Sequence, residues 1–553
     1  FWLAGFFSYE FGYFLEPCLH KLGEHTEFPL VWLGVCRKPE MLNWREHLLS
    51  CSGKRDWKMK DFRADIKLEE YKRKIRKIKD YLEEGLTYQV NFTFKMNFNF
   101  YGEPLHLYCA LKDNQPVPYP AFINTGRFSI LSLSPELFFR TEGEKVVTSP
   151  MKGTSRRGLD SLTDECNEKL LKESSKNRAE NLMIVDLLRN DLGRICDKVR
   201  VKKLFETEKY RTLYQMTSTI EAHRKRAFDL KELFRALFPC GSVTGAPKIK
   251  TMEIINKLEK EKRGIYTGAI GYVSPHKQKS CFNVSIRTVS IKGNKAEMGI
   301  GGGIVYDSKP YSEYREALLK ASFLRRRPFA GRIFETMLYR KAKGFYLLDL
   351  HLNRLNRSCS FFGIDFNRNK AKRLLKKQVD TEGKDLRVRL NIDIRGKMEV
   401  EKEELDKIKS PVKVILSRRT TDPKNLFLYH KTTCRFLYDR ERKDNCRGGI
   451  FEVIFFNKRG EVTEGTISNI FVLKNARLYT PPLKSGVLPG VLRKHLISKG
   501  KCREKVLYFE DLKEAEKIYV GNSLRGLMEA EVKWDLGTKW LGAGKRNCET
   551  KIV

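Results

Sequence analysis

Hydrophobic positions along the first half of the chain alternate between helical and extended spacing. Residues 68–86 place apolar and aromatic side chains close to the 3.6-residue period of a helix, at Tyr71, Ile75, Ile78, Tyr81 and Leu82. The β-branched and aromatic run at 87–93 then predicts a strand. By the same criteria we expect further strands within residues 1–60 and at 122–124, 128–139, 268–273 and 282–291. We expect further helices between residues 162 and 194 and at 230–237, 248–258 and 312–325. This half therefore predicts a large α+β unit that contains antiparallel sheet.

The second half alternates strands with shorter helices. A hairpin is predicted at 333–339 and 344–348, followed by a helix at 351–362, strands at 386–394, 412–416, 453–456 and 467–473, and a helix at 491–498. Between the halves, the segment Arg325 to Pro328 is basic, polar and contains proline, which is typical of a linker. We therefore expect a first domain at 1–325, a linker at 326–330 and a second domain at 331–553.

Composition limits the class of protein. At 553 residues the chain is too long for a single core, and 41% hydrophobic with 32% charged residues describes a soluble protein without a membrane-spanning run. The first seven residues are apolar but lack a basic leader, so they are predicted to form a strand and not a signal peptide. Because the chain begins in mid-strand without methionine, we expect that an N-terminal piece is missing. Thirteen cysteines without C-x-x-C spacing argue against a disulfide framework or a zinc site and favour the reducing cytoplasm.

The net charge of +39 allows two interpretations. A strongly basic balance can indicate nucleic acid or an anionic surface as a partner. The lysines, however, are spread along the chain, and no nucleic-acid-binding signature accompanies them. We therefore favour solvated faces and expect neither nucleic acid nor a membrane as a partner.

One lysine of the first half stands in a stiff local setting. Pro150 fixes its own backbone and Gly153 allows close approach of a ligand, so that a turn after a β-rich run holds Lys152. Taken alone, Lys152 is either a solvated surface charge or a positioned amine, and the surface charge is the commoner case.

Acidic residues on two predicted helices allow a metal site. Glu180 lies on a mostly apolar helix, while Glu313 and Glu316 share a helical face with a lysine and follow a glycine-rich turn predicted at 301–303. This set is either a salt-bridge face or a Mg²⁺ site whose hard oxygen ligands a substrate carboxylate completes.

The loop at 239–248 is rich in small residues and leads into a predicted helix. Its free amides make it a plausible cradle for a carboxylate. It lacks the spacing of a Walker A loop, so we do not expect it to bind a nucleotide.

Together these motifs resemble the chorismate-utilising family, which includes anthranilate, isochorismate and aminodeoxychorismate synthases. The matching segments follow the family's order across nearly the whole first half, at 88–91, 134–137, 150–154, 180–193, 241–248, 268–272, 285–288 and 301–316. The resemblance implies that Glu180 and Glu316 hold Mg²⁺, with Glu313 nearby. It also implies that the substrate carboxylates contact Tyr266, Arg287, Lys320 and the loop residues Gly241, Thr244 and Gly245.

The resemblance also distinguishes among members of the family. Water-using members carry a lysine where this chain has Gln89, so water is not expected as the nucleophile. The lysine of the Pro-x-Lys-Gly-Thr motif, Lys152, is similar to that of aminodeoxychorismate synthases. Gln215 stands where anthranilate synthases have a histidine linked to pyruvate loss, which favours a product that keeps its enolpyruvyl group.

In that family Lys152 would attack ring carbon 2 as a neutral amine and displace the hydroxyl. Glu136 would be the general acid for that departure, and ammonia would then add at carbon 4 and expel Lys152. Arg156 and Arg157 are expected to help keep the Lys152 amine neutral, since like charges disfavour its protonation.

Lys431, in the second half, is either part of a basic surface turn or a lysine that bonds to a cofactor aldehyde. Three features favour the second interpretation: Arg354 on an amphipathic helix, Glu464 before a strand, and a glycine turn at 486–490 that leads into a helix and suits a phosphate. These features resemble the two-subdomain, fold-type IV pyridoxal-phosphate enzymes, and within them aminodeoxychorismate lyase.

This second resemblance implies a set of cofactor contacts. Lys431 would hold pyridoxal 5′-phosphate and later abstract the α-proton of the substrate, while Glu464 keeps the pyridine nitrogen protonated. The phosphate would contact Arg354, the amides of Val491 and Leu492, and Asn522 with Ser523. Leu492 replaces a threonine of many relatives, so one hydroxyl contact is lost.

The two halves support one expectation, a fused enzyme that makes 4-aminobenzoate from chorismate for folate synthesis. The first half would produce the intermediate that the second consumes. No glutaminase cysteine motif is visible, so ammonia is expected from a separate glutamine amidotransferase subunit or from free ammonium. A homodimer through the second domain is a further expectation.

Two alternatives to this expectation remain open. The nearer one is an anthranilate synthase-like first half fused to a class IV aminotransferase acting on D- or branched-chain amino acids. The other is a basic nucleic-acid-binding protein without turnover, which would show steeply salt-sensitive binding to DNA.

Overall fold

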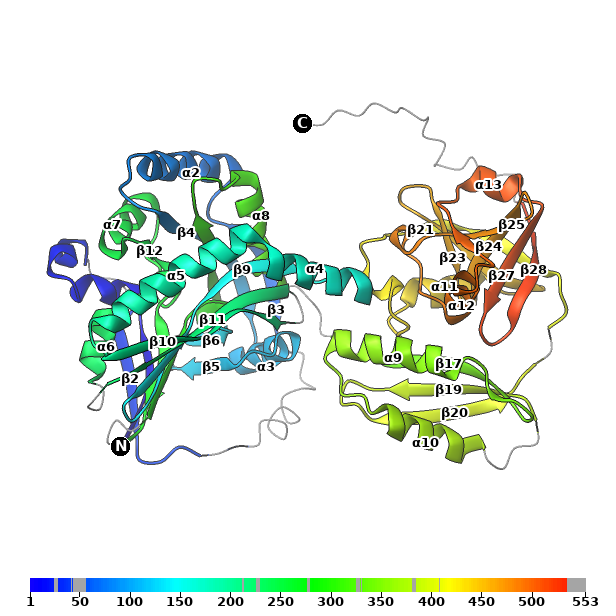
Figure 1. Cartoon of the computed structure of the whole chain (residues 1–553), viewed down its shortest axis with the longest axis horizontal. Coiled ribbons are helices and arrows are strands. Elements are labelled where there is room, and N and C mark those ends of the chain that lie inside the picture. The colour runs from blue at the N-terminus through cyan, green and yellow to red at the C-terminus, as the bar shows by residue number, and fades with distance from the viewer. Residues whose placement is uncertain are drawn as a thin grey trace. The chain divides into compact units, whose positions relative to one another are not determined.

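The computed structural model describes residues 1–23, 28–40, 42, 56–210, 213–224, 229–275, 279–324, 329, 331–379, 384–406 and 408–534. The chain forms two compact units, one of Phe1–Arg157 with Cys166–Pro328 and one of Gly158–Glu165 with Phe329–Val553 (Figure 1). Apart from Phe329, the predicted linker at 326–330 lies outside the described residues. In the ranges given above, none of the helices is both long and apolar enough to span a membrane.

Two sheets form the first unit, and the pairings between their described strands are antiparallel, as predicted. The larger sheet has the order β10 (Lys198–Lys209), β11 (Leu213–His223), β8 (Lys145–Ser149), β7 (Leu137–Glu142), β14 (Lys279–Val284), β13 (Ala269–Val273), β1 (Trp2–Phe7) and β2 (Val31–Cys36), with β9 (Met151–Arg156) also paired to β11. The smaller sheet has the order β12 (Gly245–Ala246), β4 (Gln89–Tyr101), β16 (Lys295–Ile304), β15 (Thr288–Lys292), β6 (Ser129–Ser134) and β5 (Tyr119–Asn124), with β3 (Lys58–Ala64) paired to β4.

Helices connect and cover these strands. They are α2 (Leu68–Glu83), α3 (Pro104–Asn114), α4 (Ser161–Glu173), α5 (Ser175–Gly193), α6 (Leu230–Leu237), α7 (Lys248–Leu258) and α8 (Pro310–Lys320), with the 3₁₀ helices η1 (Tyr9–Phe14), η2 (Pro17–Leu22), η3 (Gly241–Val243) and η5 (Ser322–Leu324). Helix α5 lies across β9, β10 and β11 (Figure 1). The helices predicted at 230–237 and 248–258 are confirmed at both ends as α6 and α7.

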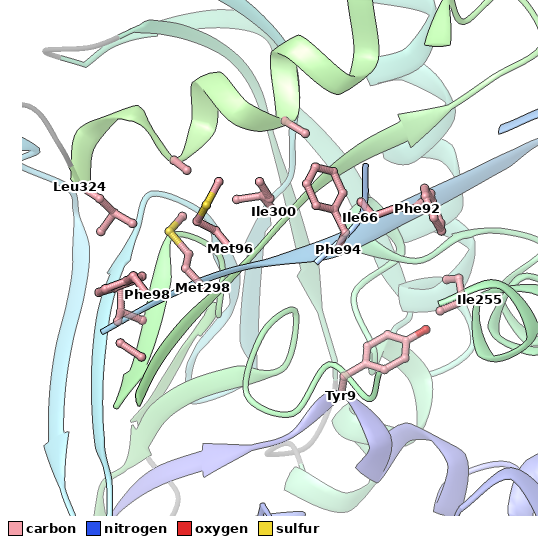
Figure 2. Packing of buried hydrophobic residues seen from close by; sticks show 14 of the residues in the cluster. Tyr9, Ile66, Phe92, Phe94, Met96, Phe98, Ile255, Met298, Ile300 and Leu324 are labelled. Carbon is pink, nitrogen blue, oxygen red and sulfur yellow. The ribbon is translucent and has the colours of Figure 1, made fainter. Parts of the chain in front are cut away.

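Strand β4 supplies much of the core of the first unit. Side chains of a strand alternate between its two faces, and every second residue of β4 from Phe92 to Phe100 is buried in one hydrophobic cluster. Met298 and Ile300 of the neighbouring β16 belong to the same cluster (Figure 2). The face of α2 that the helical spacing predicted, with Tyr71 and Ile75, packs into this cluster too.

Two segments predicted as single strands pass from one sheet to the other. Residues 128–139 form β6 in the smaller sheet and β7 in the larger one, with Pro135 and Glu136 between them. Residues 282–291 are likewise divided between β14 and β15, and Arg287 at the break has a φ of 52°. The prediction of continuous strands was wrong here, because a left-handed residue or a proline ends a ladder without interrupting the apolar pattern.

Two predicted turns are strands. Lys152 lies within β9, where Gly153 has a φ of 93°, so the stiff turn expected there is an irregular strand paired with β11. The glycines 301–303 belong to β16 and pair with Thr93, Phe92 and Asn91 of β4, and do not form a turn before α8.

The second unit contains two further sheets. One has four strands in the order β18 (Gly344–Phe345), β17 (Ile333–Arg340), β19 (Leu386–Ile392) and β20 (Met398–Glu404), with α9 (Leu348–Phe362) against β17 and α10 (Arg368–Val379) against β20. The other has eight strands in the order β23 (Val462–Gly465), β22 (Ile450–Asn457), β21 (Val412–Thr421), β28 (Gly526–Val532), β27 (Lys517–Asn522), β24 (Asn469–Lys474), β25 (Arg477–Thr480) and β26 (Arg503–Glu504). Its helices are η6 (Leu426–Leu428), α11 (Phe436–Asn445), η7 (Leu483–Ser485), α12 (Val491–Ser498) and α13 (Phe509–Lys513).

An additional pairing between β23 and β24 closes six strands of the larger sheet into a ring. The pairing joins Glu464 to Asn469. The predicted hairpin at 333–348 and the helix at 491–498 are confirmed, whereas α10, β20, β27 and β28 were not predicted.

Phe98→Ala is expected to lower the free energy of unfolding by about 3–5 kcal/mol, because it removes a buried ring of β4 and leaves a cavity. Tyr101→Ala, at an exposed position of the same strand, is the matched control and should change stability by less than about 0.5 kcal/mol. Denaturant unfolding of the full chain, followed by circular dichroism, measures both. Equal losses in the two variants would contradict the assignment of this face of β4 to the core.

Candidate active sites

A cavity of about 130 Å³ in the first unit is lined by residues from both sheets and from α5 and α8. Most of the predicted site residues of this half line it: Glu136, Lys152, Glu180, Tyr266, Arg287, Glu313, Glu316 and Lys320. The two sheet crossings described above supply Glu136 and Arg287, and the irregular strand β9 supplies Lys152. The predicted residues in this lining are separated by up to 184 positions in the sequence, from Glu136 to Lys320.

The small-residue loop contributes to this cavity through other residues than those predicted. Ser242 and Val243 line it, whereas Gly241, Thr244 and Gly245 are buried outside the lining. The Thr244 hydroxyl donates to the carbonyl of Cys240 at 2.9 Å, which uses its hydrogen within the loop.

Gln89 is fully buried, and within the described part of the chain neither atom of its amide has a hydrogen-bond partner. It does not itself line the cavity. A Cβ at Gly303 would come within 2.9 Å of Lys152 Nζ and 3.1 Å of Gln89 Cδ. Glycine at 303 therefore leaves room for both side chains, and Gln89 lies next to the amine that the sequence singled out.

Burial lowers the pKa of Lys152, and the ammonium of Lys320 acts in the same direction, while Glu180 and Glu136 oppose the shift. Arg156 and Arg157, which were expected to contribute, are not among the main causes of this shift. Arg156 is exposed, and Arg157 donates to the carbonyl of Tyr210 at 2.7 Å. Desolvation, which disfavours the ammonium form, thus favours a neutral Lys152 amine that can act as a nucleophile.

Burial raises the pKa of Glu136 to about 7, against the opposing effects of a hydrogen bond from Ser242 and of Lys152. Ser242 Oγ donates to Glu136 Oε1 at 2.6 Å, and the backbone N–H of Met151 donates to the same oxygen at 3.4 Å. A carboxyl group with this pKa is partly protonated near neutral pH and can donate a proton.

Arg287 provides a buried positive charge. Its Nη2 donates to Gln215 Oε1 at 2.7 Å, and its guanidinium lies 5.2 Å from the centre of the Tyr210 ring. Burial lowers the pKa of Arg287 to about 10, so the group stays charged at neutral pH and suits a carboxylate. Tyr266 supplies a neutral hydroxyl, since burial raises its pKa.

The predicted Mg²⁺ ligands lie against lysine ammonium groups. Lys176 Nζ is 3.8 Å from Glu180 and 3.9 Å from Glu313, while Lys320 Nζ is 3.1 Å from Glu316. Among the described residues, no group of three or more His, Cys, Asp and Glu side chains is assembled to hold a metal ion. The hard carboxylate donors still suit Mg²⁺, and an ammonium between two of them marks a place where positive charge is stabilised.

Lys431 lies in a buried site of the second unit. Its Nζ is 4.8 Å from the centre of the Phe334 ring, and its carbonyl accepts a hydrogen bond from the Phe334 N–H. Burial lowers the pKa of Lys431 to about 7, with further lowering by Arg354 and Arg435. This environment suits a lysine that must be neutral to bond with an aldehyde.

Glu464 lies where the ring of six strands closes. Its Oε2 accepts from the N–H of Leu488 at 2.9 Å and from Asn469 Nδ2 at 3.1 Å, and its Oε1 accepts from the Tyr438 hydroxyl at 3.0 Å. Burial raises the pKa of Glu464 to about 7. Each of Glu464 and Lys431 perturbs the pKa of the other, which shows that the two lie in one electrostatic environment.

Arg354 is held by a fully buried carboxylate that the sequence analysis did not identify. Glu335 accepts from Arg354 Nε at 2.7 Å and from His351 Nδ1 at 2.7 Å, and Arg354 Nη1 donates to the carbonyl of Pro489 at 3.2 Å. Burial alone would raise the pKa of Glu335, but Arg354 and His351 hold this pKa at about 2. The guanidinium thus lies next to the turn before α12.

The remaining predicted phosphate contacts surround the start of α12 and the end of β27. Val491 and Leu492 form the first turn of α12, and Ser523 is buried. The side chain of Asn522 accepts from the N–H groups of Leu524 and Arg525, so it holds the turn there. An arginine, the first amides of a helix and a partly buried lysine fit pyridoxal 5′-phosphate.

Six residues that contact the predicted site residues or their partners were not predicted from the sequence. They are Ser242, Lys176, Glu335, His351, Tyr438 and Asn469. Glu335 had a detectable signal, since it interrupts the apolar run of β17, and His351 precedes Arg354 by three residues on one helical face. Ser242 and Tyr438 had none, because only the fold brings their hydroxyls to a distant carboxylate.

Comparison with known proteins identifies two family profiles along the chain. The profile described as chorismate binding enzyme matches residues 1–326, and that of amino-transferase class IV matches residues 332–531. The first covers more than half of the chain.

Individual relatives match mainly the first half. The chain is 37% identical to aminodeoxychorismate synthase component 1 of Bacillus subtilis over 267 residues, which is 48% of this chain and 57% of that protein. It is also 37% identical to anthranilate synthase component 1 of Pseudomonas aeruginosa over 261 residues, 47% of this chain and 53% of that protein. The chain thus spans about half the length of these relatives, and identity alone does not separate the two activities.

Among solved structures, anthranilate synthase component I from Streptococcus pneumoniae aligns with a TM-score of 0.50 and 26% identity. The alignment covers 59% of this chain and 80% of that one.

Covalent trapping of Lys431 by pyridoxal 5′-phosphate and borohydride is expected to rise with pH through a midpoint of about 7, since only the neutral amine reacts. Peptide mass spectrometry after digestion measures the labelling of each lysine against pH. Exposed lysines in the same digest are the control and should rise toward a midpoint of about 10.4. A Lys431 midpoint in that higher range would contradict the effect of burial.

Proposed function

Because the chain belongs to the chorismate binding enzyme family, we propose that its first domain aminates chorismate to 4-amino-4-deoxychorismate and that its second domain removes pyruvate to leave 4-aminobenzoate. The observation that carries the proposal is the buried Lys152 amine in one cavity with Glu136 and Arg287. We assign the first reaction to residues 1–325 and the second to residues 331–553, joined by a linker at 326–330.

In the first reaction, Nζ of Lys152 bonds to ring carbon 2 as the ring double bonds shift. The hydroxyl at carbon 4 leaves as water with the proton of Glu136. Ammonia then bonds to carbon 4, the double bonds shift back, and Lys152 leaves carbon 2 as a neutral amine. The new ammonium group returns one proton to Glu136, which restores both side chains.

The neighbouring residues support amination over the related reactions. Gln89 lacks a basic group to activate water, although it lies next to Lys152 across Gly303. Gln215 binds Arg287 through its amide oxygen and cannot act as a general base for loss of pyruvate. Arg287, Tyr266 and Lys320 are proposed to bind the substrate carboxylates.

Glu180, Glu316 and Glu313 are proposed to hold Mg²⁺ once Lys176 withdraws from between two of them. The metal would supply positive charge opposite a substrate carboxylate. The loop residues Gly241, Thr244 and Gly245 are proposed to shape the cavity wall that Ser242 and Val243 form.

In the second domain, pyridoxal 5′-phosphate supplies an electron sink for the carbon that loses its proton. Lys431 is proposed to hold the cofactor and to take that proton on Nζ, which its lowered pKa allows. Glu464 is proposed to face the pyridine nitrogen. Arg354, the amides of Val491 and Leu492, and Asn522 with Ser523 are proposed to bind the phosphate.

Ammonia is proposed to come from a separate glutamine amidotransferase subunit, and the second domain is proposed to form a homodimer. The described cysteines are free thiols, which supports a cytoplasmic location.

The expected products from chorismate, Mg²⁺ and ammonium are 4-amino-4-deoxychorismate without pyridoxal phosphate and 4-aminobenzoate with it. Mass spectrometry of the two mixtures distinguishes them. Anthranilate in the mixture without the cofactor would contradict the proposal and favour an anthranilate synthase-like first domain.

Lys152→Ala is expected to abolish amination or to shift the product toward anthranilate, because the nucleophile is lost. Conversion of supplied 4-amino-4-deoxychorismate by the same variant should be unchanged, while Lys431→Ala should show the opposite pattern. Product analysis of both variants measures this. An unchanged amination rate in Lys152→Ala would exclude Lys152 as the nucleophile.

A further inference from the structure

Glu136 binds its two hydrogen-bond donors through a single oxygen. The hydroxyl of Ser242 and the N–H of Met151 both donate to Oε1, at 2.6 Å and 3.4 Å. Within the described part of the chain, no hydrogen bond reaches Oε2. Glu136 and Ser242 are only 2% and 3% exposed, and both line the cavity.

We propose that Ser242 is a positioning residue that keeps Oε1 of Glu136 as an acceptor, so that the acidic proton resides on Oε2. The inference rests on the proposed role of Glu136 as the general acid. The new element is the Ser242 hydroxyl, which determines which oxygen of Glu136 carries the proton.

Each donor contributes differently to this selection. A backbone N–H is a donor in every state, so the bond from Met151 favours Oε1 as the unprotonated oxygen. A serine hydroxyl can reverse and accept, but its other neighbour is the thiol of Cys240, at 3.3 Å from Ser242 Oγ. Burial raises the pKa of Cys240 to about 12, so the thiol keeps its hydrogen and can donate to Ser242. The chain of donors then runs from Cys240 through Ser242 to Glu136.

This arrangement assists both transfers of the proton. When the hydroxyl of the substrate leaves, the Oε2–H bond breaks, its proton forms water with the leaving oxygen, and its electron pair stays on the carboxylate. The negative charge appears on a group whose Oε1 already accepts two hydrogen bonds, so no donor has to move. The proton that returns from the new ammonium group can then bind only to Oε2, because Oε1 accepts the two hydrogen bonds.

The pH profile of amination separates this role from packing. The general acid must be protonated, so activity falls as the pH rises through the pKa of Glu136. Ser242 stabilises the carboxylate, and Ser242→Ala should therefore move this alkaline limb upward by about one pH unit and lower kcat by about tenfold or more. Ser242→Thr keeps the hydroxyl and should leave the limb within about 0.3 unit of the wild type.

A matched control and a volume-conserving variant complete the experiment. Ser280→Ala removes a similarly buried hydroxyl, which forms a hydrogen bond with the hydroxyl of Thr141 and does not line the cavity, and should leave the limb in place. Ser242→Cys fills the same space with a weak donor and should give an intermediate shift, which keeps the test valid if Ser242→Ala fails to fold. The assays use full-length protein with Mg²⁺, saturating chorismate and a fixed concentration of free ammonia.

An unmoved limb in Ser242→Ala or Ser242→Cys, whatever the loss of rate, would overturn the inference, as would an equal shift in Ser280→Ala. The Glu136 carboxyl can also be titrated without turnover, by ¹³C NMR difference spectra against Glu136→Gln. No amination by the wild type would refute the proposed function. The NMR shift would still report on Ser242, so the two failures are distinguishable.

Discussion

The removal of ionisable groups from water is the constraint on which both candidate sites depend. In the first unit, burial lowers the pKa of Lys152 and raises that of Glu136, although each would favour the charged form of the other. Desolvation outweighs their mutual attraction, and this favours an uncharged amine beside an uncharged acid. A nucleophile and a proton donor can coexist in one cavity only in these forms, since a solvated lysine and glutamate would exchange the proton.

The fold achieves this burial by passing the chain between two antiparallel sheets. Glu136 follows the crossing from β6 to β7, and Arg287 lies at the crossing from β14 to β15. At a crossing the backbone leaves its ladder, so a side chain there can point between the sheets and not only to one face or the other. The same geometry explains the positive φ of Arg287, a strained conformation that the surrounding hydrogen bonds must stabilise.

Sequence patterns predicted the elements that bury one regular face, and failed where the chain departs from regularity. Helices α6 and α7 and the buried face of α2 follow from hydrophobic spacing alone. The crossings at Glu136 and Arg287 were predicted as continuous strands, because an apolar pattern of period two does not change when a strand moves to another sheet. Lys152 and Lys431 were identifiable from motifs, whereas Ser242 and Tyr438 were not, since a hydroxyl gains its role from a partner that is distant in sequence.

In the second unit, burial likewise controls the ionisation of a lysine and a glutamate, but the neighbouring charges and hydrogen-bond donors differ. Arg354 and Arg435 add to the burial that lowers the pKa of Lys431, and three donors divide between the oxygens of Glu464. Glu136 has two donors on one oxygen, which leaves the other for the proton of the proposed general acid. Glu464 has both oxygens bound, as suits a carboxylate that keeps a fixed position beside a cationic nitrogen. The number of donors on each oxygen therefore differs between the two carboxyls in the way that their proposed roles require, even though burial raises the pKa of both to about 7.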